Sequence, residues 1–175
     1  ALGALPSLAP DGRFPSLGRL MGLALARRLD RREIAAELER QVDAFEAALG
    51  RKPDFLDGHH HVHQLPGVRE IVLDLAARRL APGGWVRSCW EPPLAILRRG
   101  IDPLRAGLIA SLGIGLRRRL VAAGVPHNRR FRGVYDFSGR VPYAALFERF
   151  TAAPGAATLV MCHPGEVDDA LRACE

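Results

Sequence analysis

Short apolar runs alternate along this chain with longer segments of helical periodicity, and this order limits the fold more than any other feature. The predicted strands are residues 54–57, 85–90 and 157–163, residues 131–137 form a weak strand or a loop, and the predicted helices are residues 30–50, 66–80, 103–123 and 141–153. Alternating strands and helices are typical of α/β proteins with a mostly parallel sheet. We therefore predict an α/β fold in a single domain, residues 1–175, in which residues 1–29 form an irregular loop region rich in Gly, Pro and Leu.

The segment after Asp30 carries the clearest helix signals. Asp30 with Glu33 three residues later resembles a capping box, in which both side chains bind free backbone N–H groups at the start of a helix. Apolar residues then recur at helical spacing, at Ile34, Leu38, Val42, Phe45 and Leu49. Gly50 is suited to end this helix, and Pro53 prevents its continuation.

The chain is basic, with a formal net charge of +6 and an isoelectric point near 10.2. Such a charge attracts nucleic acids or anionic ligands, but it is also common on a solvated surface. Nucleic-acid modules place basic residues among aromatic ones, whereas aromatic residues make up only 6% of this chain and the arginine clusters are scattered. We therefore expect no nucleic-acid partner.

The apolar runs and the cysteines of the sequence indicate where in the cell the protein resides. No run approaches the roughly 18 apolar residues of a transmembrane helix, so we expect no membrane span. The three cysteines, Cys89, Cys162 and Cys174, have no disulfide-framework spacing. An odd number of unpatterned cysteines fits a reducing compartment, and we expect a cytoplasmic protein.

The segment "DGHHHVHQLPG", residues 57–67, concentrates four of the six histidines. If strand geometry continues past Asp57, then Asp57, His59, His61 and His63 share one face and His60 points to the other. Imidazoles and a carboxylate on one face are the donors of a divalent-metal site. The cluster also follows an apolar strand, where parallel α/β proteins collect their active sites. A solvated loop is the alternative, and an internal run interrupted by Val62 is not a purification tag.

Two further residues stand at predicted strand ends. His163 follows the apolar run 157–162 and is a candidate metal ligand or general acid, or a residue that only caps the strand. Arg87 ends the segment "WVR" and is a candidate to orient a site carboxylate or to bind an anionic substrate group. A structural ion pair is the alternative role for Arg87.

The stretch "GRKPDFLDGHHHVHQLPGV", together with "VMCHPGEVDD", resembles the YdjC-like carbohydrate deacetylase family, which includes chitooligosaccharide and hopanoid-pathway deacetylases. The resemblance implies a (β/α) barrel-like deacetylase fold. It implies a metal-dependent hydrolase that removes an N-acetyl group from an acetylated amino sugar. The implied cofactor is a divalent metal ion, Mg²⁺ first, with Zn²⁺ or another ion as alternatives.

The resemblance also implies roles for individual residues. His59, the first histidine of the D-x-H-x-H pattern, would bind the metal. His163 and Asp57 would be the catalytic residues, with His163 protonating the departing amine. His61, His63 and Arg87 would contact the substrate or orient the groups around the metal.

The chain also departs from the family pattern. Family members open with a strand that carries an Asp-Asp pair and continue with a Gly-Leu-His strand, and neither motif is present here. We therefore expect an incomplete barrel, without its first strands and C-terminal helices, whose full-length parent is the enzyme. An incomplete sheet leaves an exposed edge, and pairing of two such edges would give a homodimer.

Two alternatives come from other functional classes. Amidohydrolase-type metal hydrolases also use an H-x-H motif at a barrel strand end, but they need a later lysine, and Lys52, the only lysine, precedes the motif. A non-catalytic truncated barrel that binds a metal or a partner is the other alternative.

Overall fold

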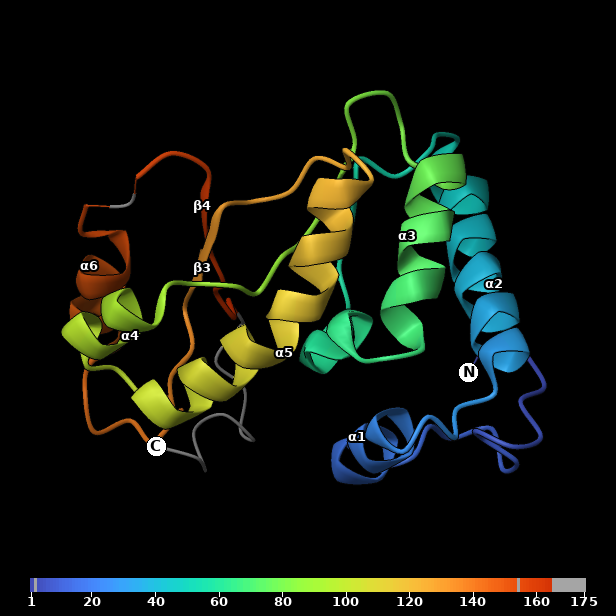
Figure 1. The fold of residues 1–175 in the computed structure, drawn as a ribbon, viewed down its shortest axis with the longest axis horizontal. Coiled ribbons are helices and arrows are strands. Elements are labelled where there is room, and N and C mark those ends of the chain that lie inside the picture. The colour runs from blue at the N-terminus through green and yellow to red at the C-terminus, as the bar shows by residue number, and fades with distance from the viewer. Residues whose placement is uncertain (2, 154, 165–175) are drawn as a thin grey trace. The chain divides into compact units, whose positions relative to one another are not determined.

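The computed structural model describes residues 1, 3–153 and 155–164, and over these ranges the chain is a mixed α/β protein (Figure 1). Its elements are α1 (Leu17–Leu25), α2 (Arg31–Leu49), β1 (Phe55–Leu56), the 3₁₀ turn η1 (His59–Gln64), α3 (Val68–Arg79), β2 (Trp85–Val86), α4 (Pro93–Arg99), α5 (Pro103–Ala122), β3 (Arg130–Arg132), α6 (Tyr143–Thr151) and β4 (Thr158–Val160). The predicted α/β class is therefore confirmed.

The chain divides into two compact units. Of the described residues, the first unit contains 1, 3–88 and 112–127, and the second contains 89–111, 128–153 and 155–164. Helix α5 contributes residues to both units. The expectation of a single domain over residues 1–175 stays a prediction.

Helix α2 begins and ends at the predicted residues. The Asp30 carboxylate accepts hydrogen bonds from the backbone N–H groups of Arg32 and Glu33, at 2.8 and 3.1 Å. Gly50 ends the helix in the left-handed conformation, with φ of 65°. The carboxylate of Glu33 accepts from the backbone N–H of Ser7, at 2.9 Å, and of Leu8, at 3.0 Å. Glu33 therefore fastens the N-terminal segment to α2.

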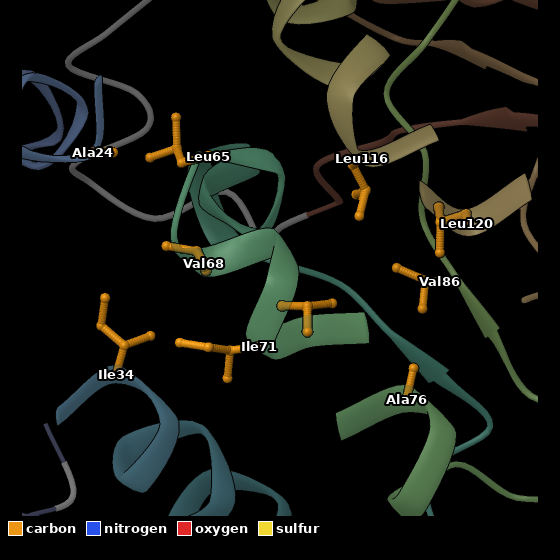
Figure 2. Packing of buried hydrophobic residues seen from close by; sticks show 10 residues of the cluster. Ala24, Ile34, Leu65, Val68, Ile71, Ala76, Val86, Leu116 and Leu120 are labelled. Atoms are coloured by element: carbon orange, nitrogen blue, oxygen red, sulfur yellow. The ribbon is translucent and has the colours of Figure 1, made fainter. Parts of the chain in front are cut away.

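The core of the first unit forms between α2, α3 and the end of α5. Figures 1 and 2 show α2 beside α3, with Ile34 from α2 near Val68 and Ile71 from α3. Leu116 and Leu120 of α5 are fully buried in the same cluster as Val86 of β2. Ion pairs between the two helices join Arg78 and Arg79 of α3 to three acidic residues of α2, namely Glu39, Asp43 and Glu46.

The described strands pair in two separate sheets of two strands each. In the first unit β1 pairs in parallel with β2, and Phe55 lies opposite Trp85. In the second unit β3 pairs in parallel with β4, and Phe131 lies opposite Leu159. Parallel pairing was predicted, but the strands are shorter than the predicted segments and form no single sheet within the described ranges. Of the incomplete barrel-like fold that the resemblance implies, this part of the chain shows two small parallel sheets.

Two helices depart from the sequence-based expectation. Residues 1–29 were predicted to be irregular, but α1 forms there because the Ser16 side chain caps its start and its apolar residues pack against the core. Helix α4 was not predicted, although it starts with Pro93 at its first position and ends at Gly100, with φ of 65°. Proline at the first position and glycine after the last are recognised helix signals. None of the described helices has the length and apolar character that a membrane crossing requires.

A buried ionic cluster organises the second unit. Glu91, which is 2% exposed, pairs with Arg99 and with Arg132, whose Nε lies 3.2 Å from the Glu91 carboxylate. Arg132 also donates to the backbone carbonyls of Phe150 and Ala152, both at 2.8 Å. Because every donor group meets an acceptor, this buried arginine ties β3 to the end of α6.

Candidate functional site

The histidine segment folds as a tight turn and not as a continuing strand. Residues 59–64 form η1, which we call the histidine turn, and His60 and His61 adopt left-handed backbone conformations with φ of 50° and 62°. The prediction that Asp57, His59, His61 and His63 share a face through strand alternation is therefore wrong. Alternation requires extended backbone at every step, and two successive left-handed residues reverse the chain direction.

Arg87 holds this turn in place. Its Nε donates to the Asp57 carboxylate at 2.5 Å, and its terminal nitrogens donate to Nδ1 of His61 at 2.8 Å and to the Gly58 carbonyl at 2.9 Å. The backbone carbonyl of Arg87 accepts from Nε2 of His63 at 2.9 Å. Arg87 is only 4% exposed. The buried side chain of Arg87 thus gathers the predicted catalytic carboxylate and His61, and its backbone carbonyl holds His63.

These hydrogen bonds assign the protons of both histidines. Arginine only donates, so Nδ1 of His61 must be the unprotonated nitrogen and its proton lies on Nε2. A carbonyl only accepts, so Nε2 of His63 carries its proton. Burial, and next the positive charge of Arg87, lower the pKa of His61 and the pKa of His63 to about 4 each. Both rings are therefore neutral near neutral pH.

Gly58 is required at the entry to the turn. A Cβ atom on this residue would lie 2.7 Å from Nδ1 of His63 and 2.8 Å from its backbone nitrogen. No side chain fits at that distance without moving the buried histidine. Sequence reasoning overlooked Gly58, although a glycine directly before a histidine run is a usual signal of a close approach.

His59 and His60 lie on the outer side of the turn and are exposed, with their ring centroids 4.0 Å apart. Their imidazoles are accessible to a ligand, which agrees with the kind of donor that a metal needs. Within residues 1, 3–153 and 155–164, however, no group of three or more His, Cys, Asp or Glu side chains is arranged to hold a metal ion. The described residues therefore supply only some of the ligands that a divalent ion needs.

A cavity of about 620 Å³ borders the histidine turn within the first unit. Asp57, His59, His60 and His63 contribute to its lining, and apolar residues of the N-terminal segment, α2 and α3 supply most of the rest. Cavities of this size that combine apolar walls with a few polar groups are typical of small-molecule sites. The histidines and Asp57 thus adjoin a space large enough for a ligand.

His163 lies in the second unit, three residues after the end of β4, and is exposed. Its ring meets the ring of Phe137 edge to face, with centroids 5.0 Å apart. The expected convergence of His163 with the histidine turn stays a prediction, because the two lie in different units. Phe137 was not recognised as a site residue, and only its position between polar residues in "YDFSGR" set it apart in the sequence.

Comparisons with known proteins identify relatives of this chain. The family model described as YdjC-like protein matches residues 2–175. Proteins named chitooligosaccharide deacetylase from Yersinia pestis (strain Pestoides F) and Yersinia pseudotuberculosis serotype O:3 (strain YPIII) are 43% identical to it over 82 residues. The alignment covers 46% of this chain and 32% of each relative, which is about a third of their length. No solved structure gives a significant match.

Proposed function

The chain belongs to the YdjC-like protein family, and from this premise we propose that it acts in a carbohydrate deacetylase, a hydrolase that removes the N-acetyl group from an acetylated amino sugar. The relatives named chitooligosaccharide deacetylase support this substrate class. We also propose the (β/α) barrel-like fold of the family for the whole protein. The parallel pairing of both described sheets, with helices between successive strands, supports that fold.

The observation that carries the proposal is the pairing of Asp57 with Arg87. Asp57 follows β1 and Arg87 follows β2, and these two strands are parallel neighbours. Their carboxyl ends therefore lie at the same sheet edge, which is where parallel α/β enzymes place their catalytic groups. The cavity beside the histidine turn opens a space for substrate next to this pair.

The proposed cofactor is a divalent metal ion, Mg²⁺ first, with Zn²⁺ as the alternative. When bound, such an ion polarises the amide carbonyl and lowers the pKa of an attacking water. His59 is the ligand that we assign within this chain, because it is the first histidine of the D-x-H-x-H pattern and its imidazole is exposed beside the cavity. Arg87 orients the Asp57 carboxylate, and His61 and His63 support the turn from which His59 projects.

We assign the proton transfer to the leaving amine to His163. Imidazole exchanges protons near neutral pH, so it suits an amine leaving group that must depart protonated. The ring is exposed and held against Phe137, which leaves its nitrogens accessible to a substrate.

We propose the cytoplasm as the compartment of this protein. The odd number of cysteines without disulfide-framework spacing, which fits a reducing environment, supports this compartment, while Cys174 lies outside the described residues. The absence of a nucleic-acid partner and the formation of a homodimer stay predictions.

A pair of neighbouring histidine variants tests the metal assignment in the protein expressed from its complete native reading frame. His59→Ala should remove bound divalent metal, measured by elemental analysis, and should abolish acetate release from an N-acetylated chitooligosaccharide. His60→Ala is the matched control, since it removes an equally exposed ring one position away, and it should keep both. Unchanged metal content and turnover in His59→Ala would overturn the assignment.

A further inference from the structure

Three aromatic side chains of the second unit lie in contact, and one of them also contacts His163. Phe137 meets the His163 ring edge to face at 5.0 Å, and Tyr135 contacts both Phe137, at 4.1 Å, and Tyr143, at 5.7 Å, between ring centroids. We call Tyr135, Phe137 and Tyr143 the aromatic patch. The patch contains both tyrosines of a chain whose aromatic content is only 6%.

The patch is anchored on one side and open on the other. Tyr135 is half-buried and reaches the fully buried Phe150, with ring centroids 6.4 Å apart. Phe137 and Tyr143 are 52% and 40% exposed. Contact with Tyr135 therefore restricts the movement of the two exposed rings. An isolated exposed phenylalanine on a loop would have no such support.

The backbone at Phe137 is also unusual. Its φ is 58°, in the left-handed region that residues with a side chain seldom occupy. Such conformations cost free energy and persist only where the surrounding structure enforces them, and they cluster at binding sites. Here the strained residue is the one whose ring contacts His163.

Polar groups border the aromatic patch. The Asp136 carboxylate accepts from the Ser138 hydroxyl, at 2.8 Å, and from Arg140, at 3.0 Å. The hydrogen bonds from Ser138 and then the one from Arg140 lower the pKa of Asp136, so the carboxylate is ionised near neutral pH. Exposed aromatic faces beside a charged hydrogen-bonding border suit a ligand that is apolar on one face and polar at its edge.

A pyranose ring has this double character. Its axial C–H bonds form an apolar face that complements the negative face of an aromatic ring, and its hydroxyl groups project from the edge toward polar partners. We propose that the aromatic patch binds the sugar ring of an N-acetylated amino sugar, with Phe137 as the central contact. This inference rests on the proposed function, because it places the sugar next to the imidazole that is assigned to protonate the leaving amine.

Saturation-transfer NMR with N,N′-diacetylchitobiose tests the patch directly. The wild-type chain should transfer saturation most strongly to the ring C–H protons of the sugar. Phe137→Ala should raise the dissociation constant about three- to tenfold, as expected for loss of one aromatic contact.

Leu104→Ala serves as the matched control. It removes an apolar side chain of the same unit that is 87% exposed, and it should leave the dissociation constant unchanged. Circular dichroism of each variant verifies folding. Equal sugar affinity in Phe137→Ala and the wild type would overturn the inference. So would a wild type that does not bind the sugar but dimerises through the patch, shown by a change in sedimentation with Phe137→Ala.

Acetate release, measured on the same samples, separates this inference from the proposed function. One outcome is that the sugar binds and that binding depends on Phe137, while the protein expressed from its complete reading frame releases no acetate. This outcome would reject the deacetylase function and keep the sugar-binding patch. Acetate release with a KM that Phe137→Ala leaves unchanged would reject the patch and keep the deacetylase. His163→Asn should abolish acetate release while sugar binding persists.

Discussion

Arg87 binds the carboxylate of Asp57, and through the same guanidinium it holds His61 and the Gly58 carbonyl. The two charged residues follow neighbouring parallel strands. Three roles were predicted for Arg87 from the sequence: to orient a site carboxylate, to bind an anionic substrate group, or to form a structural ion pair. The geometry combines the first and the third, because the buried arginine fixes both the backbone of the turn and the carboxylate beside the cavity.

Arg87→Lys tests how much the fork geometry of arginine contributes. A lysine keeps the positive charge but cannot reach Asp57, His61 and Gly58 together, so we expect the free energy of unfolding to fall by about 1–3 kcal/mol. Urea denaturation measures this change. Arg105→Lys is the control, because Arg105 forms an ion pair with Asp102 while 50% exposed, and it should cost less than about 1 kcal/mol. An equal loss in both variants would contradict the role of Arg87.

Acid should destabilise the first unit through the buried His63 and the partly buried His61. The pKa of His61 and the pKa of His63 are lowered to about 4 in the folded chain, while an unfolded histidine titrates near 6.5. Between these values the unfolded state binds more protons, so stability is complete above about pH 6.5 and falls as the pH drops toward 4. A shift of this size corresponds to about 3 kcal/mol for His63.

Urea denaturation between pH 4 and 7 measures that pH dependence. His63→Phe removes the most deeply buried titrating ring and should flatten the curve, although it also removes the hydrogen bond to Arg87 and so lowers stability at pH 7. Stability that stays constant or rises on acidification of the wild type would show that the histidines are not buried as neutral rings.

Gly133→Ala should disrupt the pairing of β3 with β4. Gly133 has φ of 99°, and a Cβ atom there would lie 2.1 Å from the Met161 carbonyl oxygen. The backbone must therefore move, and we expect the free energy of unfolding to fall by more than about 2 kcal/mol. The Met161 amide donates to the Arg132 carbonyl at 2.9 Å in the wild type. In the variant this amide should exchange its hydrogen faster. Gly139→Ala, with φ of 69° and no atom within 4 Å, should cost only about 1 kcal/mol. Similar losses at both positions would contradict the steric argument.

Glu91→Gln should destabilise the second unit strongly. The buried carboxylate balances two arginines, Arg99 and Arg132, and its neutralisation leaves both charges poorly compensated in a dry environment. Loss of one partner of a buried pair costs about 3–5 kcal/mol. Thermal unfolding measures this variant beside the control Asp74→Asn. The Asp74 carboxylate, a partner of Arg78, is 68% exposed, so its neutralisation should lower the free energy of unfolding by less than about 1 kcal/mol.

The sequence by itself determined the family and the order of helices α2, α3, α5 and α6 among the strands. Asp30 and Gly50 bound α2 because capping depends on residues within a few positions of the helix end. The spacing within "DGHHHVHQLPG" and "VMCHPGE" was sufficient to recognise the YdjC-like family, since such motifs are read along the chain. The missed helix α4 had the same kind of local signals, proline at its start and Gly100 at its end, over only seven residues.

Only the tertiary structure decided what the histidines do. Strand alternation placed His59, His61 and His63 on one face, whereas His60 and His61 adopt left-handed conformations and His63 is buried. Arg87 holds this arrangement. It is 24 residues from His63 and 26 residues from His61 in sequence, and it reaches the turn because β2 pairs with β1. A local pattern carries no information about a hydrogen bond that strand pairing creates, so the shape of the turn and the protonation of its rings followed only from the folded chain.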